Sequence, residues 1–85
     1  MNSTGNSAAV EQRFSIDAKG ANTRDVLAMI ASKGNANVLV SDQVNGKITV
    51  HLKDVTWRQA LNIVLLSQGL TARQAGDITL VDVAH

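Results

Sequence analysis

One segment, residues 47–53, constrains the fold of this chain more than any other. Its sequence is Lys-Ile-Thr-Val-His-Leu-Lys, in which apolar and polar side chains alternate without a break. This period of two is typical of a β-strand with one face against a core and the other in solvent. We therefore predict a half-buried strand whose core-facing side chains are Ile48, Val50 and Leu52. Its outward side chains are Lys47, Thr49, His51 and Lys53.

The core that this strand covers must be small and aliphatic. The chain has 85 residues, of which 45% are apolar, with one Phe, one Trp and no Tyr, Cys or Pro. That apolar content is ordinary for a single globular domain and too high for a disordered chain. We predict a flexible lead-in over residues 1–12, which are polar and small, and one domain over residues 13–84.

A helix is predicted to follow the alternating strand directly. Thr56 and Gln59 have the spacing of a capping box, in which each side chain accepts a hydrogen bond from the backbone N–H of the other residue. One arc of the helical wheel is apolar and is predicted to face the core; it holds Trp57, Ala60, Leu61, Val64 and Leu65. We expect Trp57, Leu61 and Val64 to anchor that core. Gly69 ends the helix.

Two further apolar residues, Ile63 and Leu66, lie on the opposite side of the same helix. A helix that is covered on one side only has no need of apolar residues there. These side chains are therefore either packed by a second layer of the fold or exposed to a partner.

The other elements complete an α+β order of strand, helix, strand, strand, helix and hairpin. The patterns predict a strand at 14–18, a helix at about 22–33, a strand at 37–40 buried on both faces, and a hairpin of 70–74 with 77–83. Asn45-Gly46 is a turn signal in a short loop after residue 40. We expect the two strands that this loop joins to be antiparallel.

Composition and motifs argue against catalysis and against metal binding. Without cysteine there is no disulfide, thiolate ligand or thiol nucleophile. His51 and His85 are too far apart in the sequence for a metal-ligand pair, and no catalytic or phosphate-binding motif occurs. We therefore expect no enzyme activity and no cofactor. The net charge of +1, with interspersed signs, favours neither nucleic acid nor membrane as a partner.

Three features have both a structural and a functional interpretation. Trp57 is either a core anchor, which its helical position favours, or a binding aromatic. The row of Lys47, Thr49, His51 and Lys53 is either a solvated face, which is the commoner case, or a contact for a protein or nucleic-acid partner. His51 is more often a plain exposed histidine than a pH switch. This row is the candidate partner-binding surface.

Several segments resemble the N-terminal periplasmic domain of bacterial secretins. The resemblance covers about residues 14–83 and is most specific over residues 44–61, where the family pattern is V-x-G-x-x-T-L-x-L-x-x-V-P-W-D-Q-A-L. The nearest likeness is to the type IV pilus secretin, within a short-domain family shared with TonB-dependent receptors. The chain departs from the family pattern at Thr56, where proline is usual, and at Arg58, where aspartate is usual.

The resemblance implies a fold in which two helices lie between a three-stranded and a two-stranded sheet, so that Ile63 and Leu66 have apolar neighbours. It implies a periplasmic part of an outer-membrane channel that is a homomultimeric ring, the isolated domain being monomeric. The implied partners are inner-membrane assembly proteins and a pilus, a pseudopilus or exported cargo; contact with DNA is possible but unsupported by charge. The alternatives are the signalling domain of a TonB-dependent receptor and a small nucleic-acid-binding domain.

Overall fold

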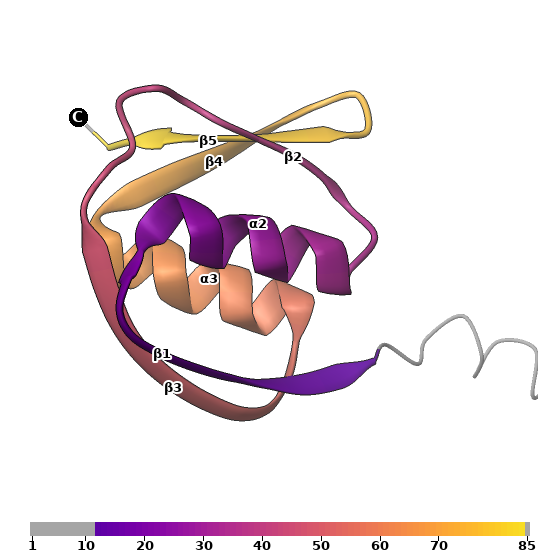
Figure 1. Ribbon diagram of the computed structural model, residues 1–85. Coiled ribbons are helices and arrows are strands. Elements are labelled where there is room, and N and C mark those ends of the chain that lie inside the picture. Colours follow the sequence, from indigo (N-terminus) through magenta and orange to yellow (C-terminus); the bar gives the residue numbers. More distant parts are fainter. Residues whose placement is uncertain (1–11, 85) are drawn as a thin grey trace, which may run out of the picture.

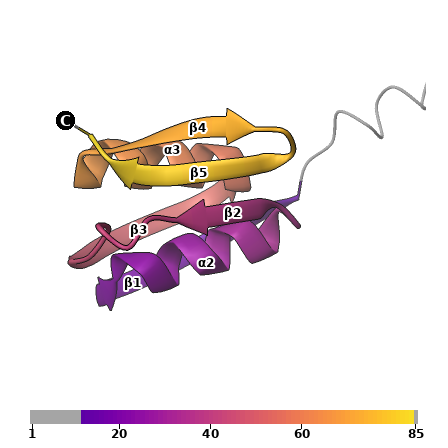
Figure 2. The ribbon, with the colours of Figure 1, turned by 90° about the horizontal axis from the view of Figure 1, so that it is seen from above.

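Two helices lie side by side between two separate sheets, as expected for this α+β fold (Figure 1). The computed structural model describes residues 12–84. The elements are β1 (Arg13–Asn22), α2 (Thr23–Lys33), β2 (Asn37–Val40), β3 (Lys47–Thr56), α3 (Trp57–Gln68), β4 (Leu70–Ala75) and β5 (Ile78–Val83). Seen from above, α3 lies on the β4 side of the molecule and α2 on the β2 side (Figure 2). The predicted lead-in falls on residues that, except for residue 12, lie outside the described part.

The pairing of the strands differs from the prediction at one point. β1 pairs antiparallel with β3 in the two-stranded sheet, and the other sheet has the order β2-β5-β4. β2 pairs parallel with β5, and β4 pairs antiparallel with β5 across the expected hairpin. β2 and β3, which were expected to be antiparallel, lie in different sheets and do not pair, because the link between them carries the chain from one sheet to the other.

The link at residues 41–46 is anchored to the rest of the domain by Val44 and by Arg24. Val44 is 1% exposed and reaches into the core from the middle of the link. The Arg24 guanidinium donates to the backbone oxygen of Ser41 at 2.6 Å and to that of Val44 at 3.3 Å. A charged donor on two carbonyls fixes the course of the link. Gly46, with φ of 109°, then turns the chain into β3.

β1 and β3 are longer than predicted because each continues past a β-bulge. The register slips between Phe14 and Ile16 and again between Ala18 and Ala21. Near these slips Asp54 and Gly20 have φ of 58° and 61°, in the left-handed region. Bulges bend a strand and increase its twist. The two-stranded sheet is accordingly a curved ribbon under the helices (Figure 1).

The core draws fully buried side chains from both helices, both sheets and the link. Its buried members are Ile16, Val26, Leu27, Ile30, Val44, Ile48, Ala60, Leu61, Val64 and Val81. β2 was predicted to be buried on both faces, which is wrong, since Leu39 is 60% exposed. The three-stranded sheet is an outer layer, so that only its helix-facing side is covered.

Thr23 is the one buried polar side chain among the described residues, and it joins the two helices. Its hydroxyl donates to Gln68 Oε1 at 3.1 Å, and its backbone N–H donates to the Gly46 oxygen at 3.1 Å. The start of α2, the end of α3 and the link are therefore tied together at one end of the domain.

The capping box at the start of α3 is confirmed. The Gln59 backbone N–H donates to Thr56 Oγ1 at 3.2 Å, and the Thr56 backbone N–H donates to Gln59 Oε1 at 2.9 Å. At the other end, Gly69 takes the left-handed conformation with φ of 65°. The cap at α2 differs from it: Asn22 occupies the N-cap position, but its side chain makes no capping hydrogen bond.

Removal of the capping hydroxyl is expected to destabilise the domain measurably. Thr56→Ala should lower the free energy of unfolding by about 1 kcal/mol, because one backbone N–H at the helix start loses its acceptor. In a domain of this size, that corresponds to a decrease in Tm of about 4–8 °C, measurable by thermal unfolding followed by circular dichroism. Thr56→Ser keeps the hydroxyl and serves as the control. Equal losses in the two variants would contradict the capping role.

Candidate interaction surfaces

The predicted row on β3 lies on the outer face of the two-stranded sheet. Ile48 and the partly buried Val50 and Leu52 point toward the helices, as the alternation predicted. The four outward residues are all exposed: Lys47, Thr49, His51 and Lys53.

Three members of this row contact β1 across the sheet. The Gly20 backbone N–H donates to Thr49 Oγ1 at 3.0 Å, next to the bulge in β1. His51 Nδ1 lies 3.4 Å from Asp17 Oδ1, and both side chains are at least 75% exposed. Such an exposed pair contributes little to stability, because solvent screens it. Lys47 Nζ reaches Asn22 Oδ1 at 3.5 Å, at the limit of a hydrogen bond.

The sheet that bears this row is more basic than the chain as a whole. β1 and β3 together hold four Lys or Arg residues and two Asp residues, a surplus of two positive charges, whereas the whole chain has a surplus of one. The pairing of strands that are distant in sequence brings these charges together, which linear composition does not reveal. We call the outer side of the β1–β3 sheet the basic face.

The helix residues predicted as core anchors occupy different depths. Val64 and Leu61 are 0% and 7% exposed, whereas Trp57 is only partly buried at the edge of the core. The Trp57 ring occupies the space that a side chain at residue 34 would need, so any larger residue than Gly34 would displace the ring or the end of α2. The Arg58 guanidinium lies 4.9 Å from the centroid of the same ring. Trp57 therefore closes one end of the helix layer and remains in contact with solvent.

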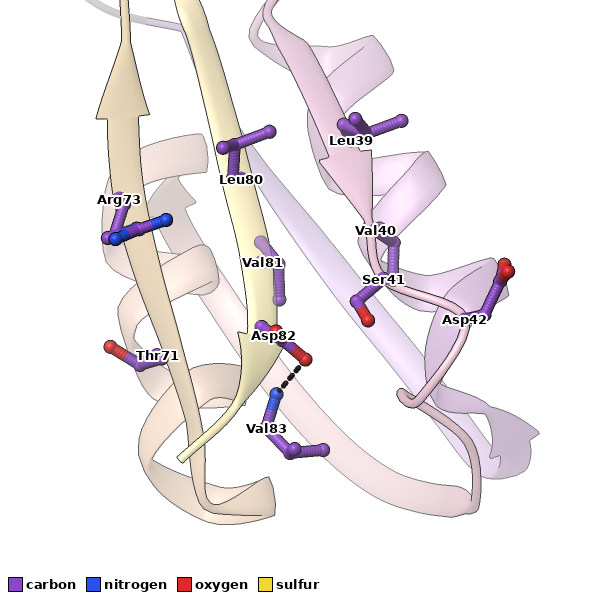
Figure 3. Close-up of a pocket in the computed structure, with 10 residues that line it drawn as sticks. All are labelled: Leu39, Val40, Ser41, Asp42, Thr71, Arg73, Leu80, Val81, Asp82 and Val83. Atoms are coloured by element: carbon purple, nitrogen blue, oxygen red, sulfur yellow. Dashed lines mark hydrogen bonds between the residues drawn. The ribbon is translucent and has the colours of Figure 1, made fainter. Parts of the chain in front are cut away.

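A hollow of about 640 Å³ lies on the outer face of the three-stranded sheet (Figure 3). Its floor is apolar, because Leu39 and Leu80 lie side by side in the register of β2 and β5. Arg73, which is opposite Leu80 on β4, lines one side. Asp42 and Asp82 line the other end. We call this feature the sheet hollow. It was not predicted from the sequence, because it forms only where β2 pairs with β5.

The outer side of α3 is uncovered, contrary to what the resemblance implied. Leu66 is 84% exposed and Ile63 is 37% exposed. The helices form a layer only two wide, so α3 meets α2 on one flank and a sheet above and below, while its other flank has no neighbour. Arg58, Asn62 and Leu66, spaced four residues apart, form a row along that flank. We call this row with Ile63 the α3 ridge.

The described residues were also searched for a metal-ligand cluster and for a membrane-spanning helix. Among residues 12–84, no group of three His, Asp or Glu side chains is placed to hold a metal ion. Over the same span, no helix has the length and apolar character to cross a membrane. The features that remain are the basic face, the sheet hollow and the α3 ridge, all of which are suited to contact with other molecules.

A comparison of the sequence with known protein families assigns the chain to one of them. Residues 36–82, more than half of the chain, match the family described as "Secretin and TonB N terminus short domain". The chain belongs to this family. This secretin-type short domain was the resemblance noted in the sequence, and the match spans β2 to β5, which includes the sheet hollow and the α3 ridge.

Known relatives of this short domain include pilus secretins. It is 40% identical over 67 residues to the type IV pilus biogenesis and competence protein PilQ of Neisseria meningitidis, covering 79% of this chain and 9% of that protein. In the cryoEM structure of the V. cholerae type IV competence pilus secretin PilQ, it matches with a TM-score of 0.71 at 37% identity, covering 80% of this chain and 16% of that one. The chain thus spans about a tenth of the length of the curated relative.

The fold itself also matches a more distant structure. The N0 domain of the type II secretin from enterotoxigenic Escherichia coli superimposes with a TM-score of 0.77, covering 88% of this chain and all of that one, at 15% identity. At that identity the match shows the fold alone. It agrees with the arrangement of two helices between two small sheets.

Proposed function

We propose that this domain is a non-enzymatic periplasmic interaction module of an outer-membrane secretin that serves type IV pilus biogenesis or DNA uptake. The observation that carries the proposal is the identity of about 40% with a pilus secretin over four fifths of the chain. In this function the domain docks inner-membrane assembly proteins and passing cargo, and its copies are carried by a multimeric channel. The similarity to pilus secretins supports this function over the signalling domain of a TonB-dependent receptor.

The basic face is the docking surface in this proposal. Its exposed row points away from the core, so a partner can contact it without unfolding the domain. The surplus of positive charge suits a partner with an acidic surface, because complementary charge accelerates encounter and sets orientation. In a two-stranded sheet both strands also have a free edge, which can accept a strand from a partner.

A domain exchange tests the proposed function. Replacing the matching segment of Neisseria meningitidis PilQ with residues 12–84 of this chain should preserve piliation and transformation in that host. In the exchanged protein, Lys47→Glu with Lys53→Glu should lower both readouts about tenfold, since two charges that attract the partner become repulsive. Lys47→Arg with Lys53→Arg keeps the charge and should retain them.

Each result of this exchange has a distinct meaning. Loss of piliation with the unmodified domain, when the channel is present in the outer membrane, would contradict the module function. Full activity of the glutamate variant would contradict the basic face as the docking surface and leave the module function standing. Binding of the purified chain to duplex DNA that weakens steeply with salt would identify DNA as the ligand of the same face.

A further inference from the structure

The Asn45-Gly46 pair, noted above as a turn signal, lies in the link between β2 and β3. This link runs along the outside of the molecule (Figure 1). Both residues are exposed, and there is open space around Gly46 where another residue would carry its Cβ atom. With φ of 109°, Gly46 has a conformation that glycine adopts readily and other residues do not. An asparagine in such a place is open to attack on its side-chain amide by the next backbone nitrogen.

The groups that take part in such an attack are weakly held. Within residues 12–84, the Gly46 backbone N–H donates no hydrogen bond. The Asn45 amide donates from Nδ2 to the Gln43 oxygen at 3.4 Å, near the limit of a hydrogen bond. Neither the attacking nitrogen nor the amide that it attacks therefore has to give up a strong contact.

The link is anchored on both sides of the peptide bond that joins Asn45 to Gly46. On one side Val44 is buried in the core. On the other side the Gly46 oxygen accepts a hydrogen bond from the Thr23 backbone N–H at 3.1 Å. The peptide bond itself lies between these anchors and is exposed. We therefore expect the side chain and this nitrogen to meet without unfolding of either sheet.

The other described asparagines lack this combination. Thr23 and Ala36, which follow Asn22 and Asn35, donate their N–H groups to backbone oxygens. Asn62 lies inside α3, where the backbone N–H groups are used by the helix. The remaining described asparagine begins β2 and precedes a β-branched residue, whose side chain crowds the backbone.

We propose that Asn45 is a site of spontaneous covalent modification, at which the folded domain converts asparagine to aspartate and isoaspartate. The Gly46 nitrogen bonds to the side-chain carbonyl carbon of Asn45, the amide nitrogen leaves as ammonia with the proton of the attacking N–H, and a succinimide ring remains. Water then opens the ring at either carbonyl carbon, giving aspartate or isoaspartate. Overall one water is consumed and one ammonia is released, so neither an oxidant nor a reductant is needed.

Both products change the surroundings of the link. Each places a carboxylate directly before Lys47, the first residue of the basic face. Isoaspartate also lengthens the main chain by one carbon, next to the hydrogen bond from Thr23 to Gly46. Loss of that hydrogen bond should lower Tm by about 4–8 °C. Weaker attraction of an acidic partner rests on the proposed function, whereas the modification itself does not.

A comparison of folded and denatured chains tests the proposal. Both are incubated in the same mildly alkaline buffer, one of them in guanidinium chloride. Peptide mapping locates the gain of about 1 Da, and enzymatic methylation detects isoaspartate. If the fold blocked ring closure, the reaction would require global unfolding, which would slow it about a thousandfold or more. We expect instead that Asn45 reacts in the folded chain within about tenfold of its rate in the denatured chain.

Two variants separate the reaction from its consequences. Asn45→Gln keeps an amide but needs a larger ring to react, so the mass gain at this residue should disappear while Tm stays unchanged. Freshly prepared Asn45→Asp adds the charge without the longer main chain, so it should elute earlier from a cation-exchange column with little change in Tm. A rate in the folded chain more than about tenfold below the denatured rate, or equal rates at Asn45 and Asn62 in the folded chain, would overturn the proposal.

Discussion

Leu27→Ala is expected to remove a large part of the stability of this domain. Leu27 is 0% exposed and lies on α2 between the two sheets, so truncation leaves a cavity that the surrounding layers cannot fill. Such substitutions cost about 2.7–5 kcal/mol. The whole stability of a domain of this length is about 4–13 kcal/mol. The midpoint of urea unfolding should therefore fall steeply while the slope of the transition remains unchanged.

Leu66→Ala is the matched control for that substitution. It removes the same atoms from the other helix, but from a side chain that is 84% exposed, so the free energy of unfolding should change by no more than about 0.5 kcal/mol. The comparison isolates burial, because the residue types are identical. Similar losses in the two variants would show that the flank of α3 is covered in the free chain, against the structure described above.

Gly34→Ala is expected to lower the free energy of unfolding by about 2 kcal/mol, although it adds a single methyl group. Gly34 has φ of −92°, which alanine adopts without strain, so the backbone alone would favour the substitution slightly. The added carbon meets the side chain of Trp57, and the ring or the end of α2 must move. Overpacking of this kind typically costs about 1–3 kcal/mol. Chemical unfolding followed by circular dichroism measures the loss.

A double-mutant cycle distinguishes this clash from any other effect of Gly34→Ala. In a Trp57→Leu background the ring is absent, so alanine at residue 34 should become neutral or slightly stabilising. The coupling energy between the two substitutions should then be about 2 kcal/mol. An equal loss from Gly34→Ala in both backgrounds would show that the close approach of Gly34 to Trp57 is not the cause.

Local sequence signals predicted the elements well, because the physics that forms them is local. The alternation over residues 47–53 placed Ile48 inside and the charged row outside, and the Thr56–Gln59 spacing identified the helix start. A period of two specifies which side of a strand is buried but not which strand lies beside it. For that reason the partner of β2 was predicted wrongly, and the full lengths of β1 and β3, which continue past bulges, were underestimated.

The candidate surfaces were predictable only to the extent that they lie within one element. The row of the basic face follows from the alternation of β3 alone. The sheet hollow needs Leu39 beside Leu80, which are 41 positions apart and meet only through parallel pairing. Exposure of Leu66 depends on the width of the helix layer, which no pattern within α3 records. An apolar side chain at that residue was compatible with packing against a second layer or with exposure to a partner. The resemblance favoured packing, which is wrong.

The crossing of the chain from one sheet to the other also has a consequence for how the domain folds. Pairing of β1 with β3 closes a loop over residues 13–56, and pairing of β2 with β5 closes one over residues 37–83. These closures overlap over residues 37–56, so no single cut of the chain gives two continuous pieces that each hold one complete sheet. We therefore expect the domain to fold as one cooperative unit, so that the surfaces described above form together.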